Sequence, residues 1–207
     1  MSGLFITFEG GDGVGKSTQL RLLAELVSGA GREVVTTREP GGTDLGVEIR
    51  NIVLHHRGDI APRAEALLYA ADRAHHVDTL VRPALDRGAV VIQDRYFDSS
   101  VAYQGAGRVL AGDEIRSISM WATDDLVPDI TILLDLDPTS ARKRLDADDK
   151  VFDRLESEKS DFHARVRNGF LALAAAEPQR WLVIDASLPV DVIASTIAER
   201  VTNALGV

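Results

Sequence analysis

The feature that most constrains this chain is a glycine-rich turn between an apolar run and a helical pattern near its start. Residues 4–10, LFITFEG, predict a strand that ends in glycine, and residues 16–31 have apolar residues at the spacing of one helix face. Between them, Gly10, Gly15, Lys16 and Ser17 match G-x-x-x-x-G-K-[ST]. This strand–turn–helix context is the one that a phosphate-binding loop requires, so the alternative of a plain glycine turn is disfavoured.

The loop favours a nucleoside triphosphate as its ligand. Its glycines let backbone N–H groups point inward, and the helix N-terminus adds partial positive charge. Lys16 is expected to reach the β- and γ-phosphates, and the Ser17 hydroxyl is expected to ligate Mg²⁺. A dinucleotide fingerprint that begins at Gly10 would need glycine where Asp12 stands. The residues expected to contact ATP are Gly10, Gly11, Asp12, Gly13, Val14, Gly15, Lys16, Ser17 and Thr18.

The rest of the chain alternates short apolar runs with helical patterns. Further strands are predicted at 33–40, 88–96, 128–138 and 180–187. Helices are predicted from Thr43 onward, over 63–87 with a kink near Pro83, and over 155–176. Alternation of this kind implies parallel strands joined by right-handed crossovers. We therefore expect an α/β three-layer sandwich with a five-stranded parallel sheet, whose ligands lie beyond the carboxyl ends of the strands.

Length and composition set the broad class. The 207 residues fit a single domain spanning 1–207. The sequence has no cysteine, which excludes disulfides and thiolate metal sites and favours a cytoplasmic location. A net charge of −9 disfavours nucleic-acid partners, and no apolar run is long enough to suggest a membrane segment. The pairs His55-His56 and His75-His76 are interpreted as packed or solvated histidines rather than metal ligands, because adjacent helical residues point apart.

Three arginines in separate segments are candidates for a second anionic ligand. Two of them, Arg38 and Arg95, lie at predicted strand ends, and Arg73 lies in a predicted helix. The arginine side chain offers a planar, permanently charged guanidinium that can bind phosphate or the edge of a base. A surface salt bridge is the alternative for any one of them. Asp94 ends a predicted strand, either as an acidic partner of Mg²⁺ or as half of a structural ion pair.

The ordered motifs make the interpretation specific. FEGGDGVGKST (8–18), TREPGGT (37–43), YAADR (69–73), DRYFDSSVAYQGAGR (94–108) and DRLESE (153–158) follow one another at characteristic intervals. In this order they resemble thymidylate kinases of the bacterial type, over nearly the whole chain. The resemblance implies the P-loop nucleotide kinase fold with a mobile lid, ATP-dependent phosphorylation of dTMP to dTDP with Mg²⁺ in dTTP biosynthesis, and a homodimer.

The resemblance also implies roles for individual residues. Lys16 and the loop amides would hold the ATP phosphates, and Arg142 would stack on adenine beside the segment after Asp185. Arg95 would bind the dTMP phosphate, with Arg38 and Glu39 shaping that site. The residues implied at the nucleoside are Tyr69 beneath thymine, in place of the family's usual phenylalanine, Arg73, Ser100 and Gln104 at the base, and Tyr103 at the 2′ position.

A lid over about residues 142–158 is expected to exclude water. Gly13 occupies the P-loop position where one class of the family has its catalytic arginine, so the resemblance implies lid cations instead. The middle of this lid is acidic, which leaves Arg144, Lys150 and Arg154 as candidates. Arg154 is favoured, with Lys150 in support, giving a catalytic set of Lys16, Arg95 and Arg154. Asp153 and Glu156 either organise Mg²⁺ or begin a helix.

Asp12 places a negative charge inside a loop built for anions. Its backbone is expected to face ATP while its side chain points away, toward Mg²⁺ or the 3′-hydroxyl region of dTMP that the resemblance implies; a local turn is the alternative. Two other functions stay open on the residues alone. One is a kinase for a different nucleoside or nucleotide, and the other is a nucleotide-dependent switch, which would not need the three arginines.

Overall fold

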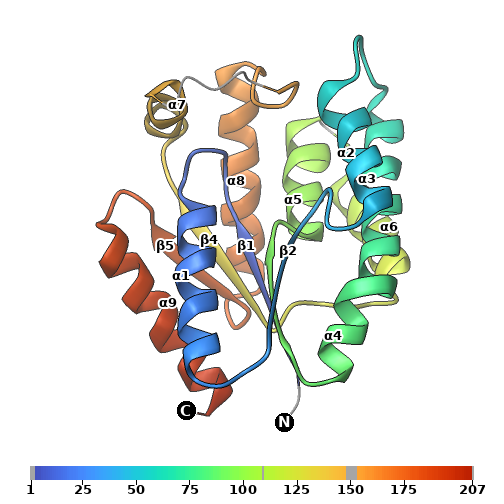
Figure 1. Ribbon diagram of the computed structural model, residues 1–207. Helices are drawn as coiled ribbons and strands as arrows, with labels where there is room; N and C mark the ends of the chain where they lie inside the picture. The colour runs from blue at the N-terminus through green and yellow to red at the C-terminus, as the bar shows by residue number, and fades with distance from the viewer. Residues whose placement is uncertain (1–2, 109, 148–152, 207) are drawn as a thin grey trace.

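A single parallel sheet organises the structure, a computed structural model that describes residues 3–108, 110–147 and 153–206. Its strands are β1 (Leu4–Glu9), β2 (Val34–Arg38), β3 (Val90–Asp94), β4 (Ile130–Asp135) and β5 (Trp181–Asp185). They lie in the order β2-β3-β1-β4-β5, and every neighbouring pair is parallel. The expected five-stranded parallel sheet is therefore confirmed (Figure 1).

Helices cover both faces of this sheet, which gives the expected three layers (Figure 1). On one face, α1 (Lys16–Gly29) and α9 (Val190–Leu205) pack on Ile6, Phe8 and Ile132. On the other face, strand residues such as Phe5, Val91 and Leu133 pack against a second set of helical segments. These helical segments are α2 (Asp44–His55), α3 (Pro62–His76), the π-helical η1 (Val77–Val81), α4 (Arg82–Asp86), α5 (Phe97–Ser100), the π-helical η2 (Val101–Gly107), α6 (Gly112–Thr123) and α8 (Ser160–Ala176).

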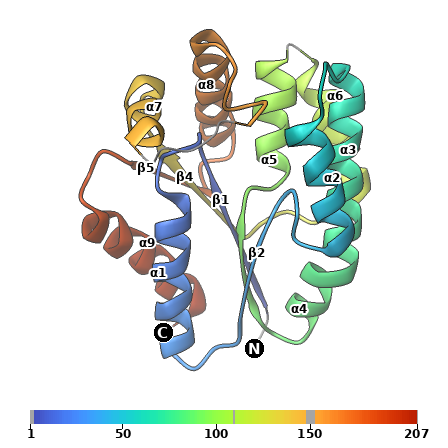
Figure 2. The same cartoon turned by 45° about the horizontal axis from the view of Figure 1, so that its top comes forward.

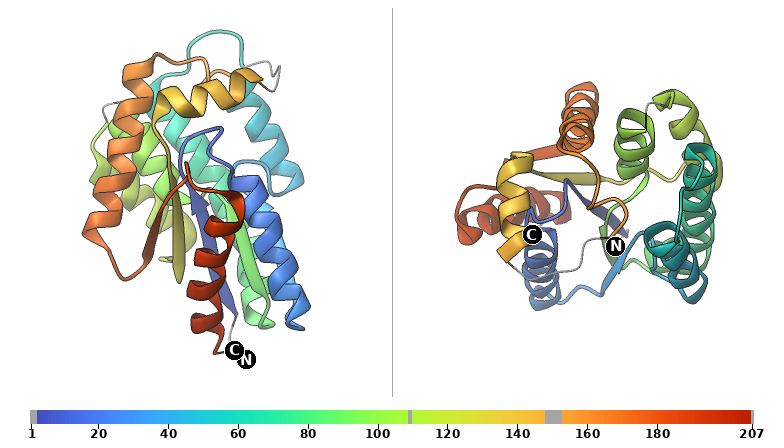
Figure 3. Two further views of the ribbon diagram at one scale, coloured as in Figure 1. Left: turned by 90° about the vertical axis from the view of Figure 1, so that its left-hand side faces the viewer. Right: turned by 90° about the horizontal axis from the view of Figure 1, so that it is seen from above.

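The carboxyl ends of the strands gather at one edge of the sheet. The phosphate loop follows β1 there, Arg38 ends β2 and Asp94 ends β3. In Figure 2 this edge is turned forward, with α7 (Pro138–Ala147) on one side of the loop and α2 on the other. Figure 3 shows the same edge from above, with the helices arranged around it. Parallel pairing thus brings the sequence motifs together where the sheet predicts a ligand site.

Two helix predictions are refined by the structure. Residues 62–86 are helical without a break. In place of the kink expected near Pro83, the structure has a π-helical turn over Val77–Val81. This turn comes just before Pro83, which has no backbone N–H to donate a hydrogen bond to the preceding turn. The helix predicted over 155–176 begins only at Ser160. The Asp153 carboxylate accepts hydrogen bonds from the backbone N–H groups of Leu155 and Glu156, which holds a tight turn instead of a first helical turn.

Candidate active site

The phosphate loop adopts a conformation that depends on its glycines. Gly10 has φ 128° and Gly13 has φ 78°, in the left-handed region that side chains avoid. A Cβ at Gly10 would lie 2.5 Å from the Leu134 carbonyl oxygen, so a side chain has no room there. Lys16 Nζ donates to the Gly11 carbonyl at 2.7 Å and to that of Gly10 at 3.2 Å. Burial lowers the pKa of Lys16, because desolvation disfavours its charged form.

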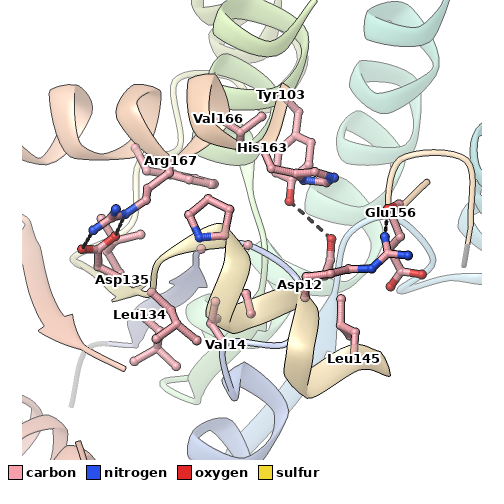
Figure 4. Close-up of a pocket in the computed structure, with 18 residues that line it drawn as sticks. Asp12, Val14, Tyr103, Leu134, Asp135, Leu145, Glu156, His163, Val166 and Arg167 are labelled. Atoms are coloured by element: carbon pink, nitrogen blue, oxygen red, sulfur yellow. Dashed lines mark hydrogen bonds and ion pairs between the residues drawn. The ribbon is translucent and has the colours of Figure 1, made fainter. Parts of the chain in front are cut away.

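The Asp12 side chain points toward Arg95 and Tyr103. Its Oδ1 accepts from Arg95 Nη2 at 2.6 Å, and its Oδ2 accepts from the Tyr103 hydroxyl at 3.4 Å. Figure 4 shows Asp12 and Tyr103 facing each other. Both partners lie in the segment after β3, so the contact is long-range rather than a local turn. The loop therefore joins the two halves of the site through one carboxylate.

Arg95 is fixed by contacts on several sides. Its backbone has φ 66°, which is unusual for a residue with a side chain and directs the chain sharply away from β3. Its Nη1 donates to the Gly10 carbonyl at 3.0 Å and to Ser99 Oγ at 3.2 Å. Its guanidinium also lies over the Tyr103 ring, with Cζ 5.1 Å from the centroid. This cation is thereby held at the junction between the phosphate loop and the rest of the site.

Glu9, the last residue of β1, contacts the segment that carries Arg95, although no motif predicts a role for it. It is fully buried, accepts from Tyr96 N at 2.8 Å and accepts from Ser99 Oγ at 2.5 Å. Burial, with a further contribution from Asp98, raises the pKa of Glu9 from 4.5 to about 8. A buried carboxyl whose charged form is disfavoured therefore supports the turn that carries Arg95.

Arg73 occupies a buried polar pocket together with other predicted residues. Its Nε donates to Glu39 Oε2 at 2.9 Å and its Nη2 donates to Ser100 Oγ at 2.9 Å. His76, also buried, contacts the other Glu39 oxygen at 3.0 Å and Thr37 Oγ1 at 2.7 Å. Glu39 lines the same cavity as Arg38, and its carboxylate also orients Arg73. His76 is thus a packed histidine with two polar partners.

The predicted residues converge on one large cavity, the main cavity, of about 830 Å³. Its volume is within the range of small-molecule sites. Its lining includes residues of the phosphate loop, of α1 and of α9, together with Tyr69 and Gln104. The residues predicted from sequence that line it are Asp12, Gly13, Val14, Gly15, Lys16, Ser17, Thr18, Arg38, Glu39, Tyr69, Arg73, Asp94, Arg95, Ser100, Tyr103, Gln104 and, from the predicted lid, Arg144, Asp153 and Glu156.

A second, smaller cavity of about 60 Å³ lies between the phosphate loop, α7 and α8. Gly10 and Gly11 contribute to its wall rather than to that of the main cavity. Figure 4 shows its lining, which includes the ion pair that Arg167 on α8 forms with Asp135, at 2.7 and 2.8 Å. This pair anchors α8 to the end of β4.

Arg142 lies on a different side of α7 from the one expected. Its Nη1 donates to the Glu156 carbonyl at 3.2 Å, and its side chain lines the second cavity. Arg144 instead donates from Nη2 to the Ala186 carbonyl at 3.0 Å and lines the main cavity. Residues two apart on a helix face nearly opposite directions. The position beside the segment after Asp185, which was assigned to Arg142, therefore belongs to Arg144.

The described parts of the predicted lid are 142–147 and 153–158; its middle, including Lys150, lies outside the described residues. Arg154 donates from Nε to the Val53 carbonyl at 2.9 Å, and its Nη2 pairs with the buried carboxylate of Glu65. Its guanidinium is therefore directed to α2 and α3 and not toward the phosphate loop. This differs from the expected orientation of a lid cation toward a transferred phosphate.

Several functional candidates were missed because each depends on contacts distant in sequence. Arg50 donates to the Pro40 carbonyl at 2.9 Å and lines the main cavity with Leu54 and Leu155. Glu65 is fully buried and accepts from Gln104 Nε2 at 2.9 Å. One sequence signal could have identified Glu65. It lies four residues before Tyr69, which lies four residues before Arg73, and this spacing places all three on one face of α3.

Residues 3–108, 110–147 and 153–206 contain no cluster of three or more histidine and acidic side chains placed to hold a metal ion. Within the same ranges, every helix is too short or too polar to cross a membrane.

Comparisons with known proteins show the family. A family model described as thymidylate kinase matches residues 8–197. The chain is 70% identical to a thymidylate kinase from Clavibacter sepedonicus, covering 97% of this chain and 95% of that one. It is 57% identical to one from Bifidobacterium longum, over 95% and 96% of the two chains. The crystal structure of thymidylate kinase from Ehrlichia chaffeensis matches with a TM-score of 0.79 at 33% identity, over 97% of this chain and 99% of that one. The chain therefore belongs to the thymidylate kinase family.

Proposed function

We propose that the chain transfers the terminal phosphoryl group of ATP to dTMP, giving ADP and dTDP, within the main cavity. Membership of the thymidylate kinase family supports ATP and dTMP as its substrates. One observation carries the proposal: the Asp12–Arg95 pair, 2.6 Å long, joins the phosphate loop to the arginine-lined pocket in a single cavity. A donor nucleotide on the loop and an acceptor in the pocket would meet at this pair.

The donor half holds triphosphate by backbone groups and Lys16. Lys16 now donates to the carbonyls of Gly10 and Gly11, and it would exchange these partners for phosphate oxygens. Arg144 lies against Ala186, so we assign the stacking on adenine to Arg144 and not to Arg142. The apolar residues Leu188 and Ile193 border the same end of the cavity and would cover the base.

The acceptor half holds a nucleoside monophosphate. Arg95, together with the exposed Arg38, would bind its phosphate, and Asp12 would contact the 3′-hydroxyl region. The buried Tyr69 ring would lie beneath the base. The side chains proposed to read the base edge are Arg73, Ser100 and Gln104. Tyr103 is packed against Phe162 and Phe170, which fixes its ring where it would crowd a 2′-hydroxyl.

The residues present fit a magnesium ion. Asp94 Oδ1 is buried and has no hydrogen-bond partner among the described residues, and Asp94 lines the main cavity with the exposed Ser17. Mg²⁺ prefers one or two protein oxygens together with substrate phosphates and water, so this small donor set suffices. Bound there with ATP, Mg²⁺ would neutralise charge on the phosphates. Ser17 and Asp94 are the residues that would hold it.

Catalysis in this site depends on position and charge rather than on covalent chemistry. The dTMP phosphate is itself an anionic nucleophile, so a strong general base is not needed. Lys16 and Arg95 both donate to the Gly10 carbonyl, and together they would stabilise the negative charge spread over the transferred group. Arg154, the third member proposed from sequence, would first have to leave Glu65.

An acceptor panel tests the proposed function. The protein is incubated with ATP and Mg²⁺ and with dTMP, dUMP, dCMP, ribothymidine monophosphate or thymidine, and the diphosphate or monophosphate product is measured. Preferred formation of dTDP is expected, with modest discrimination against dUMP, because one methyl group is worth about 1–3 kcal/mol in a fitted pocket. Faster phosphorylation of thymidine or dCMP would refute the assignment, and slow ATP hydrolysis with no acceptor would indicate a switch.

We also propose that the protein forms a homodimer through the outer face of α2, α3 and α6. These adjacent helices carry Ile52, Leu67 and Trp121 with exposed fractions of 46%, 56% and 85%. Large apolar side chains gathered on one surface indicate a protein interface, and a second copy of the same chain is the common occupant. A mass near twice 22.4 kDa in light scattering is expected, with a shift toward monomer in Trp121→Glu. A monomeric parent protein would refute the proposal.

A further inference from the structure

Glu65 is a buried carboxylate that the proposed mechanism has not used. It lies in the first turn of α3 and is fully buried. Its Oε1 accepts from Gln104 Nε2 at 2.9 Å and from Arg108 Nε at 3.4 Å. Its Oε2 accepts from Arg154, and Arg108 also pairs with Glu158. Two guanidinium groups therefore compensate the charge of Glu65, and one amide completes its shell.

This shell fixes the direction of the Gln104 amide. An amide side chain can donate through nitrogen or accept through oxygen, and turning it over exchanges the two. An ionised carboxylate can only accept, so the nitrogen of Gln104 must face Glu65. The carbonyl oxygen is then the group that Gln104 can present to a ligand in the main cavity, which it lines. Glu65 thereby makes the Gln104 amide a hydrogen-bond acceptor toward the cavity.

An acceptor at this position matches one kind of pyrimidine edge. Thymine and uracil have an N3–H donor between two carbonyl oxygens, whereas N3 of cytosine is itself an acceptor. The neighbouring Arg73 guanidinium can only donate, which suits the O4 of thymine and opposes the amino group of cytosine. Two groups of fixed polarity, Arg73 oriented by Glu39 and Gln104 oriented by Glu65, are therefore complementary to a thymine-type edge.

We propose that Glu65 is a positioning residue for base selection, which holds the Gln104 amide so that its carbonyl oxygen meets the N3–H of the acceptor base. The inference rests on the proposed contact between Gln104 and the base. Glu65 does not touch the substrate and acts only through Gln104. It sets the preference for a pyrimidine that carries hydrogen on N3 and leaves recognition of the 5-methyl group to other residues.

Glu65→Gln tests this inference, because its amide can donate as well as accept and so permits Gln104 to turn over. The ratio of kcat/KM for dTMP to that for dCMP is expected to fall by about tenfold or more, since one buried donor–acceptor mismatch is relieved. The ratio for dTMP to dUMP should stay at its original value, because both bases have N3–H. General damage to the lid or to stability acts on all acceptors alike and cancels in both ratios.

Further variants separate the possible outcomes. Glu158→Gln is a matched control, since it alters the same network without touching Gln104, and both ratios should be unchanged. Glu65→Asp keeps the negative charge, but its carboxylate is one methylene farther from Gln104. This variant is used for the test if Glu65→Gln does not fold. In a Gln104→Ala background, Glu65→Gln should have no further effect on the dTMP-to-dCMP ratio.

Each failure has its own meaning. An unchanged dTMP-to-dCMP ratio in a folded Glu65 variant would overturn the inference, and so would an equal fall in the Gln104→Ala background. If Gln104→Ala alone leaves this ratio unchanged, the proposed contact between Gln104 and the base is itself wrong.

Discussion

Arg144 and Arg142 offer a sharp test of how α7 is used, because they lie two residues apart and face different cavities. Arg144 contacts the Ala186 carbonyl and lines the main cavity, whereas Arg142 contacts the Glu156 carbonyl and lines the second cavity. If adenine stacks on the Arg144 guanidinium, Arg144→Ala removes that contact and one positive charge near the donor. Arg142→Ala removes an equal charge from the same helix and is the matched control.

The expected magnitude follows from the exposure of the site. Arg144 is exposed, so a guanidinium–ring contact there is worth about 0.5–1 kcal/mol rather than the larger value of a buried one. The KM for ATP should therefore rise about two- to fivefold in Arg144→Ala, since 1.4 kcal/mol corresponds to about tenfold. Arg142 also forms an exposed pair with Asp146, four residues on, worth about 0.3–0.5 kcal/mol to stability. Its removal should leave the KM for ATP within about twofold of the original value.

Steady-state kinetics with ATP varied at saturating dTMP measure this effect, and the KM for dTMP serves as an internal reference. Thermal unfolding of both variants checks that α7 stays folded. A larger increase in the KM for ATP in Arg142→Ala than in Arg144→Ala would refute the assignment and restore the prediction made from sequence.

Three further predictions concern the acidic and basic groups around the loop. Asp12→Asn should lower kcat/KM for dTMP by about tenfold or more, because the hydrogen bond to Arg95 loses its charge assistance, and the KM for ATP should change little. Asp86→Asn, far from the site, is the control. Equal loss toward both substrates would mean that Asp12 only shapes the loop. Arg154→Ala should lower kcat by about 10² with the KM for dTMP nearly unchanged; a lower Tm with unchanged kcat would assign it to anchoring alone. The pKa of Glu9 is raised from 4.5 to about 8 in the folded chain. Between these two pH values, Glu9 is therefore more protonated in the folded chain than in the unfolded chain. The free energy of unfolding should consequently fall as the pH rises through this range. Glu9→Gln should flatten that dependence in urea unfolding at pH 5 to 8, and an unaltered slope would contradict the raised pKa.

The fold was largely predictable because its signals are local. Each strand is a short apolar run bounded by glycine, proline or charge, and parallel pairing follows from the helices between them. The phosphate loop was predictable for the same reason, since all of its determinants lie within residues 4–18. The start of α8 was not, because residues 155–158 have helical composition and only the side chain of Asp153 stabilises a turn in their place.

The site was predictable in its membership but not in its internal contacts. Glu9 lies in the quoted loop motif, yet its raised pKa comes from burial beneath Tyr96 and Ser99, about ninety residues away in the chain. Likewise, helical spacing shows that Arg142 and Arg144 diverge, but only the packing of α7 decides which of them faces the segment after β5. Sequence motifs identify which side chains belong to a site, whereas their orientation depends on tertiary contacts.

In this chain of net charge −9, carboxylates also pair with the arginines that would bind the two anionic nucleotides. The key arginines of the main cavity are each held by a carboxylate: Asp12 holds Arg95 and Glu39 holds Arg73, both within 2.9 Å. Such pairing reduces the net positive charge, which weakens long-range attraction for phosphate. It also fixes each guanidinium before the ligand arrives, so that less conformational freedom is lost on binding. Glu39 fixes the donors of Arg73 and, under the proposal above, Glu65 fixes the acceptor of Gln104, so buried carboxylates also give the pocket the polarity with which it would distinguish one base from another.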